Sequence, residues 1–104
     1  YIHNPQVTLM RTTPEECAEL GCILAEKANA CTAGCAVMIP RKAVSVISAA
    51  GQPFHDAVAD EALYGALREH SRQPVEEFDL EINDPAFAKA CAEKLLSLMA
   101  AKGR

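Results

Sequence analysis

The feature that most constrains this chain is an apolar run that passes directly into a helix start signal. The run is Val7–Arg11, and Thr13, Pro14 and Glu16 follow it. Threonine at the N-cap, proline at the first helical position and glutamate three residues after the cap form a capping box. This box satisfies free N–H groups in the first turn of a helix. The stretch therefore predicts a buried strand over Val7–Arg11 and a helix that ends near Asn29.

Two later stretches repeat this strand-to-helix order. The continuous apolar run Cys35–Ile39 predicts a central strand covered on both faces, and a helix is expected over about 58–72. The alternating run Val75–Ile82 predicts a third strand near a sheet edge, before a helix that reaches about Ala101. We therefore predict a three-layer α/β fold, a mainly parallel sheet with flanking helices that resembles half of a Rossmann fold. The favoured strand order is 1-2-3, with 2-1-3 as the alternative.

Helical spacing also predicts which side chains face the sheet. In the first helix, Gly21 is expected to allow a close approach to the sheet, because a glycine is costly in a helix interior. The predicted inner positions are Cys17, Gly21, Leu24 and Ala28 in the first helix, Ala59, Leu63, Ala66, Leu67 and His70 in the second, and Phe87, Cys91, Leu95 and Leu98 in the third.

Length and charge limit the classes of protein that fit. A chain of 104 residues builds one domain, and its net charge of -4 argues against nucleic acid or an anionic membrane as the main partner. No apolar run approaches the roughly 20 residues of a membrane span. The five cysteines form no CxxC pair, so we expect no metal site and a cytoplasmic protein whose thiols are reduced. The start YIHNPQ contains no methionine, and we interpret the chain as a fragment of a longer protein.

Polar residues follow each predicted strand, where ligands of open α/β sheets usually bind. Helix N-termini present free N–H groups and the positive end of a dipole, and arginine adds a planar fork of donors, so the edge suits phosphate. Taken singly, these residues are better explained by structure, Thr13 and Asp84 as helix caps and Arg41 and Lys42 as a solvated loop, whereas for the whole set a binding site is an equal alternative. The candidate cofactor-binding residues are Arg11, Thr12, Thr13, Arg41, Lys42, Ser45, Asn83 and Asp84.

Arg11 carries a specific expectation. A cation beside a helix N-terminus is unfavourable unless a negative group intervenes. Either Glu15, Glu16 or Asp84 neutralises it, or a bound ligand does.

Two further readings of the chain compete with ligand binding. His55 next to Asp56 is a possible acid–base pair of an enzyme, in a hydrolase or an epimerase-like reaction, although Asp56 fits a helix N-cap equally well. The third reading is a dimerisation or partner-docking module without a small ligand.

The same stretches resemble a known family. VTLMRTTPEECAELG, ILAEKANA, IPRKAVSVIS, GQPFHD, DEALYGALRE and INDPAFAKA are similar, in order and spacing, to the C-terminal part of the Tm-one-like ATP-binding family. Its members are uncharacterised proteins of bacteria, fungi and plants. The family is named for a plant protein that inhibits replication of tomato mosaic virus. The sequence departs from the family pattern at Ala43, where a glycine is usual, and at Ser48, where an aspartate is usual.

The resemblance implies a longer protein with two α/β subdomains, in which residues 1–104 form a single α/β domain, most of the second subdomain. It also implies possible binding of ATP or another nucleotide, and dimerisation. The expected partners are therefore the missing N-terminal subdomain and a second copy in a homo-oligomer, with neither nucleic acid nor membrane among them.

Overall fold

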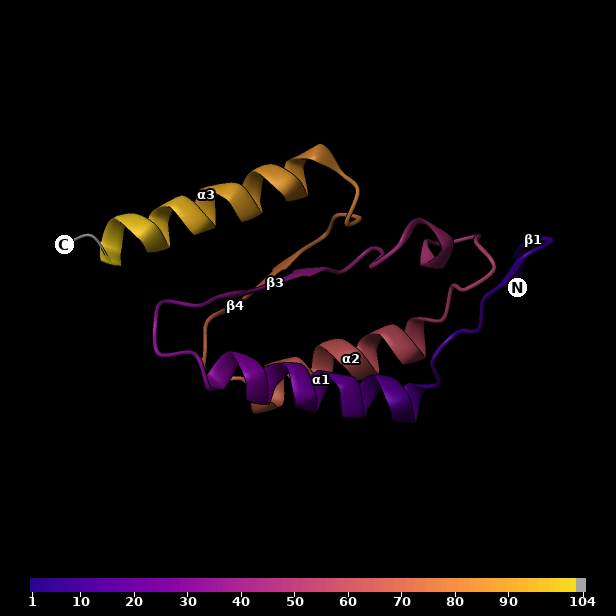
Figure 1. The fold of residues 1–104 in the computed structure, drawn as a ribbon, viewed down its shortest axis with the longest axis horizontal. Coiled ribbons are helices and arrows are strands. Elements are labelled where there is room, and N and C mark those ends of the chain that lie inside the picture. Colours follow the sequence, from indigo (N-terminus) through magenta and orange to yellow (C-terminus); the bar gives the residue numbers. More distant parts are fainter. Residues whose placement is uncertain (103–104) are drawn as a thin grey trace.

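The structure is a computed structural model that describes residues 1–102. Within this range the chain forms helices, short strands and one 3-10 turn (Figure 1). They are β1 (Ile2–Asn4), β2 (Val7–Thr8), α1 (Pro14–Asn29), β3 (Val37–Pro40), η1 (Val46–Ser48), α2 (Ala57–His70), β4 (Val75–Phe78) and α3 (Pro85–Lys102).

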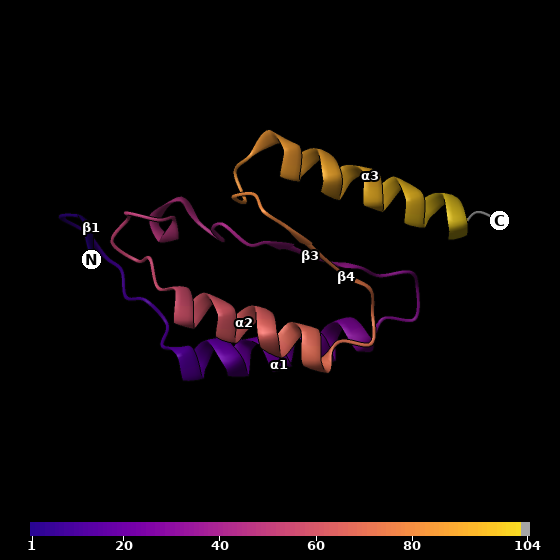
Figure 2. The same ribbon diagram turned by 180° about the vertical axis from the view of Figure 1, so that it is seen from behind.

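Strands β3 and β4 form a small parallel sheet with helices on both sides. Val37 lies opposite Val75, and the register continues to Pro40 opposite Phe78. Figures 1 and 2 show α1 and α2 side by side below this sheet and α3 above it. The three helices run in the same direction, from the carboxyl end of the strands back toward their start. The predicted α/β fold with flanking helices is confirmed.

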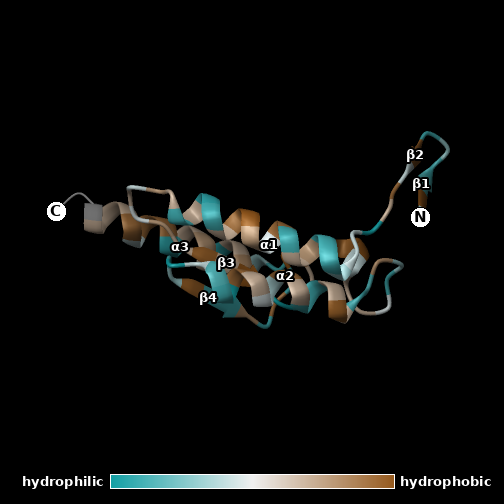
Figure 3. Cartoon of the chain, turned by 90° about the horizontal axis from the view of Figure 1, so that it is seen from below, coloured by the Kyte–Doolittle hydropathy of each residue, from teal (hydrophilic) through white to brown (hydrophobic). Residues whose placement is uncertain are grey.

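The predicted place of the first strand is wrong. Within residues 1–102, Val7–Thr8 pairs antiparallel with Ile2–Asn4 in a separate sheet, and Leu9–Arg11 is not a strand. The parallel sheet has only two strands, so neither the order 1-2-3 nor the order 2-1-3 describes it. Figure 3 shows the resulting hairpin projecting away from the helices.

The hairpin forms because its partners are close in sequence. The Tyr1 amino group donates to the Leu9 carbonyl oxygen over 2.8 Å, and the Leu9 N–H returns to the Tyr1 carbonyl oxygen over 2.6 Å. In the turn, the Gln6 N–H donates to Asn4 Oδ1 over 2.9 Å. Closing so short a loop costs less entropy than pairing with β3, which lies about 30 residues further along the chain.

The start of α1 follows the predicted capping box. The Glu16 N–H donates to Thr13 Oγ1, and the Thr13 N–H donates to Glu16 Oε1. The helix then packs along α2. Gly21 allows this contact, because a Cβ atom at Gly21 would lie 2.6 Å from Ala66 Cβ and 2.7 Å from the Leu63 carbonyl oxygen. The close approach is therefore to α2 and not, as predicted, to the sheet.

The core lies between the α1–α2 layer and β3. It consists of Ala25, Ile39, Tyr64 and Leu67. The Tyr64 hydroxyl donates to the Pro40 carbonyl oxygen over 3.2 Å, which ties α2 to the end of β3. Burial raises the pKa of Tyr64 to about 12, and the charge of Asp60 acts in the same direction.

Three predicted inner positions prove to be exposed: Leu24 on α1, His70 on α2 and Leu95 on α3. Helix α3 meets β4 both at its start and further along. Phe87 meets Phe78 edge-on with ring centroids 5.8 Å apart, and Lys94 Nζ lies 2.9 Å from Glu76 Oε2. No helix within residues 1–102 combines the length and the apolar character needed to cross a membrane.

Candidate functional site

A cavity of about 380 Å³ lies at the carboxyl end of β3, where the predicted site was expected. It brings together the entry to α1, the loop after β3 and the first turns of α2. Three predicted binding residues line it: Arg11, Thr12 and Ser45. The other lining residues are Met10, Cys17, Leu20, Val44, Ile47, Ser48, Phe54, Asp60 and Leu63.

Arg11 is held in a fixed orientation at this cavity. Its Nη2 donates to Asp60 Oδ1 over 2.5 Å, and its Nη1 donates to the Phe54 carbonyl oxygen over 2.9 Å. A longer bond of 3.4 Å joins Nε to the Thr12 carbonyl oxygen. A guanidinium has five N–H donors, so these bonds leave two for a ligand.

Asp60 is the carboxylate that neutralises Arg11, instead of the predicted Glu15, Glu16 or Asp84. Its side chain is 9% exposed and that of Arg11 is 19% exposed, so water screens the pair little. Burial acts to lower the pKa of Arg11, but the hydrogen bond and charge of Asp60 raise it above its ordinary value.

The spacing of α2 in the sequence contains a signal for the burial of Asp60. Asp60, Tyr64 and Leu67 share one face of α2 at helical spacing, and all three are buried. An acidic residue on a buried stripe needs a cation partner.

Hydroxyl groups line the rest of the polar wall. Ser48 Oγ donates to the Ser45 carbonyl oxygen over 3.0 Å, whereas the Ser45 side chain makes no cap hydrogen bond to the η1 turn that it begins. Thr12 Oγ1 lies 3.1 Å from Cys17 Sγ. The Ser45 hydroxyl can therefore bind a ligand without breaking a contact of the η1 cap.

The remaining predicted binding residues do not line this cavity. Thr13 caps α1, and Asp84 Oδ1 accepts from the Ala86 N–H over 2.9 Å at the start of α3. Lys42 is exposed in the loop after β3. Asn83 is also exposed, in the turn that precedes α3. The predicted convergence is thus limited to Arg11, Thr12 and Ser45, and the residues after β4 lie outside the cavity.

Arg41 belongs to an acidic and basic cluster on the outer side of α2. It lies 3.5 Å from Glu61 and 3.6 Å from Glu77. Arg68 bridges the same two carboxylates at 2.6 and 2.8 Å. Hydrogen bonds from Arg68 hold the pKa of Glu61 and the pKa of Glu77 below their ordinary value. The cluster ties α2 to β4, and its charges are already paired.

His55 and Asp56 make separate contacts in this structure. Asp56 Oδ1 accepts from the Ala59 N–H over 3.0 Å and caps α2. His55 is exposed, and its Nδ1 lies 3.3 Å from the Ser48 carbonyl oxygen. No hydrogen bond joins the two side chains in the part of the chain that the structure describes.

The five cysteines are free thiols, and only Cys17 is fully buried. Within residues 1–102, no three His, Cys, Asp or Glu side chains lie close enough together to hold a metal ion.

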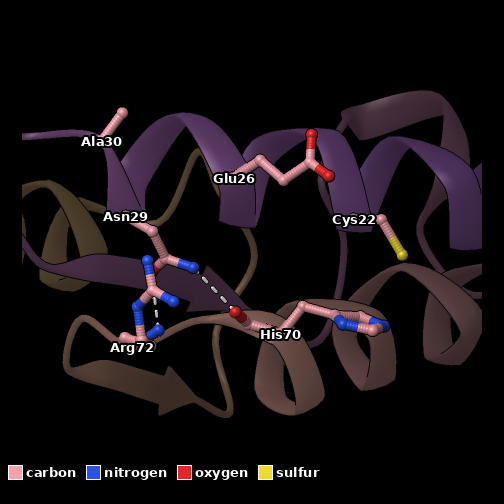
Figure 4. Close-up of a pocket in the computed structure, with 6 residues that line it drawn as sticks. All are labelled: Cys22, Glu26, Asn29, Ala30, His70 and Arg72. Atoms are coloured by element: carbon pink, nitrogen blue, oxygen red, sulfur yellow. Dashed lines mark hydrogen bonds between the residues drawn. The ribbon is translucent and has the colours of Figure 1, made fainter.

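A second cavity, of about 480 Å³, lies at the opposite ends of α1 and α2 (Figure 4). Its central side chain is Asn29, whose Nδ2 donates to the His70 carbonyl oxygen over 2.8 Å. Asn29 Oδ1 accepts from the Arg72 N–H over 2.6 Å. Asn29 thus joins the end of α1 to the turn before β4. This feature stabilises the fold, and none of the predicted site residues lines it.

Comparison with known proteins places these features in a family. Residues 1–99 match the model of the C-terminal domain of an uncharacterised protein family, UPF0261. This chain belongs to the UPF0261 family. The match covers the whole hairpin, both sides of the cavity at Arg11 and nearly all of α3.

The relatives of this UPF0261 domain occur in bacteria and plants. A UPF0261 protein of Rhizobium meliloti is 46% identical over 94 residues, which are 86% of this chain and 24% of that protein. One of Clostridium tetani is 42% identical over 102 residues, which are 95% of the chain and 25% of that protein. The tomato ToMV resistance protein Tm-1(GCR237) is 35% identical over 100 residues, which are 92% of the chain and 13% of that protein.

The resemblance to the C-terminal part of the Tm-one-like family is confirmed by these matches. The chain spans about a quarter of the length of the bacterial relatives. Those relatives therefore contain a large part beyond the region that corresponds to this UPF0261 domain.

Proposed function

We propose that this UPF0261 domain contributes one wall of a nucleotide-binding site, centred on the cavity at Arg11. The observation that carries the proposal is that Arg11, Thr12 and Ser45 line one cavity of about 380 Å³ at the carboxyl end of β3. That volume is within the range of small-molecule and cofactor sites. The cavity also joins a few polar groups to apolar walls, as ligand sites usually do.

The charge of the cavity supports a nucleotide over free phosphate. Asp60 already compensates Arg11, so an isolated phosphate would gain little net attraction. A nucleotide offers more, because its phosphate oxygens can accept from the two remaining N–H groups of Arg11 while a ribose hydroxyl donates to the second oxygen of Asp60. The resemblance to a Tm-one-like ATP-binding family agrees with this ligand class.

The part of the protein outside this chain would supply the opposite wall. The cavity is open on one side of a domain that spans about a quarter of its bacterial relatives. The tomato relatives are named for resistance and for susceptibility to tomato mosaic virus. We include in the proposal a role of this kind for the present protein, which it would perform together with a second copy or another partner.

The test uses the protein at its natural length. Titration calorimetry with ATP, ADP and inorganic phosphate should show binding of the nucleotides and little binding of phosphate. The double variant Arg11→Gln/Asp60→Asn removes both charges but keeps hydrogen-bonding groups at both positions, so the fold is retained while nucleotide affinity falls about tenfold or more. Lys42→Gln, outside the cavity, is the matched control and should bind as the wild type does. Equal nucleotide affinity in all three proteins would contradict the proposed site.

A docking module is the second candidate function. It is favoured by the apolar side chains that α3 leaves exposed, among them Leu95 at 58%, Leu96 at 65% and Met99 at 59%. Exposed apolar patches of this kind mark interaction sites in soluble proteins. Analytical ultracentrifugation of the wild type and of a Leu96→Glu variant distinguishes a docking role from nucleotide binding. Only a docking role makes the molar mass in solution depend on the exposed apolar face of α3.

A further inference from the structure

Two of the free thiols lie in the loop that joins α1 to β3 (Figure 1). Cys31 follows the end of α1, and Cys35 comes four residues later, shortly before β3 begins. The chain bends at Thr32 and Ala33, between the two cysteines. Cys31 is exposed, whereas Cys35 is partly buried. The loop therefore combines one accessible thiol with one sheltered thiol.

Both thiols gather at the last turn of α1. The Cys31 N–H donates to the Ala28 carbonyl oxygen over 3.1 Å, and Cys31 Sγ donates to the Lys27 carbonyl oxygen over 3.7 Å. Cys35 and Ala28 line the same apolar groove, of about 360 Å³, between α1, α2 and β3. Burial raises the pKa of the Cys35 thiol, and the hydrogen bond and charge of Cys31 raise it further. The two thiols are therefore close enough to interact.

The loop is also held on its other side, by α3. A Cβ atom at Gly34 would lie 3.2 Å from Leu98 Cδ2, so the backbone next to Cys35 packs directly against this helix. The bonds of Cys31 fix the other end of the loop to α1. Groups that are already fixed lose little entropy when they react with each other. The fold therefore favours a bond between these two thiols over a bond from either thiol to a free molecule.

The ligand set around the pair fits oxidation better than metal binding. A structural zinc site needs more protein ligands than two thiols. Within residues 1–102, no further His, Cys, Asp or Glu side chain joins these thiols in a group that could hold a metal ion. Two neighbouring thiols, one of them accessible, have a different reaction open to them, which is exchange with a disulfide.

We propose that Cys31 and Cys35 are a reversible oxidation site, which closes to a disulfide when it meets a small-molecule disulfide of the glutathione class. Cys31 reacts first, because it is the exposed thiol. Its thiolate attacks one sulfur of the oxidant, the S–S bond of the oxidant breaks, and the released thiolate takes up a proton. Cys35 then loses its proton and attacks the Cys31 sulfur, which releases the second small thiol. In total the two cysteines lose two electrons and two protons, and the oxidant gains them.

The test uses the protein at its natural length, which is first reduced and then incubated with glutathione disulfide. The remaining free thiols are alkylated, and the protein is digested with trypsin. Cleavage after Lys27 and after Arg41 places Cys31 and Cys35, without any other cysteine, in the peptide 28–41. This peptide should carry no alkyl group and should be lighter by two hydrogen atoms than its reduced form. Excess glutathione should make both cysteines available for alkylation again.

Single serine variants separate the roles of the two thiols. Cys35→Ser should stop at a mixed disulfide between Cys31 and glutathione, because no second thiol displaces the glutathione. Cys31→Ser should react at least about tenfold more slowly than the wild type, because the remaining thiol is sheltered. Cys91→Ser is the matched control, since Cys91 lies on α3 and in a different tryptic peptide. It should form the Cys31–Cys35 bridge as the wild type does.

Repeating the exchange in urea shows whether the fold brings the thiols together. At equal glutathione concentration, the ratio of bridge to mixed disulfide should be at least about tenfold higher in the folded protein than in urea. Three outcomes would overturn the proposal. Peptide 28–41 with two alkyl groups after incubation shows that the pair is not oxidised. A disulfide from Cys31 or Cys35 to another part of the protein shows a different pairing. An equal ratio in urea shows that the fold contributes nothing to it.

Discussion

Arg11 and Asp60, which are 49 residues apart in sequence, form the 2.5 Å ion pair that joins the entry of α1 to the first turn of α2. The pair sits beside the cavity, and it also fixes the segment from which the N-terminal hairpin projects. One interaction therefore links the stability of the helix pair to the geometry of the proposed site.

Loss of Arg11 should expose this dependence. Arg11→Ala leaves the Asp60 carboxylate buried without its cation, and we expect a loss of about 3 kcal/mol in the free energy of unfolding. Arg11→Met/Asp60→Leu removes both charges and should recover most of that loss, because a buried pair is often replaceable by apolar residues. Urea unfolding of both variants checks the expectation. Equal losses in the two proteins would show that the charge of Asp60 is well solvated without Arg11.

The two helical glycines should respond to alanine with opposite sign. Gly21→Ala places a methyl group 2.6 Å from Ala66 Cβ and should cost about 1–3 kcal/mol through overpacking. At Gly65 a new Cβ meets only Arg68 Nη1, at 3.9 Å, so Gly65→Ala should stabilise α2 by about 0.5–1 kcal/mol. Thermal melts of both variants test the α1–α2 contact. A neutral Gly21→Ala would mean that the helices are further apart.

The ion pairs of Arg68 with Glu61 and Glu77 should make the stability of the fold depend on pH. Hydrogen bonds from Arg68 lower the folded-state pKa of Glu61 and of Glu77 below 4.5. Their contribution is therefore present above about pH 4.5 and is lost as the pH falls through the folded pKa values. Arg68→Met should lower the urea midpoint at pH 7 and have a smaller effect at pH 3. Glu69→Gln, on the exposed side of the same turn, should show no such pH dependence.

Asn29 should control the order of the turn before β4. Asn29→Ala removes its bonds to the His70 carbonyl oxygen and to the Arg72 N–H, at a cost of about 1 kcal/mol. The Arg72 amide should then exchange faster with solvent. Asn29→Asp keeps the acceptor for Arg72 and loses only the donor, so the protection of that amide should survive. Faster exchange in both variants would assign the protection to the backbone instead.

The buried core and the exposed apolar side chains of this domain lie in different places. The buried cluster of Ala25, Ile39, Tyr64 and Leu67 joins α1, α2 and β3 within this chain. The exposed apolar side chains on α3 and on α1 lie outside that cluster.

The sequence alone determined the features that depend on neighbours in the chain. The capping box of Thr13 and Glu16 joins residues three apart, and the start of α1 appeared where it was predicted. The cap at Asp56, the apolar run of β3 and the start of α3 at Pro85 followed in the same way. The α/β class was predictable for this reason, because it requires only the order of such local elements.

Tertiary structure alone decided which distant groups meet. Arg11 had several possible carboxylate partners, and Asp60 was selected only when α2 packed beside α1. Gly21 was correctly expected to allow a close contact, but the contact is with Ala66 and the Leu63 backbone of α2. The pairing of Val7–Thr8 also depended on a competition between two partner strands. Pairing with Ile2–Asn4 closes a small loop, whereas pairing with β3 would close a large one. Local spacing carries no information about which of two such pairings has the lower free energy, because that difference is set by packing and loop entropy across the whole chain.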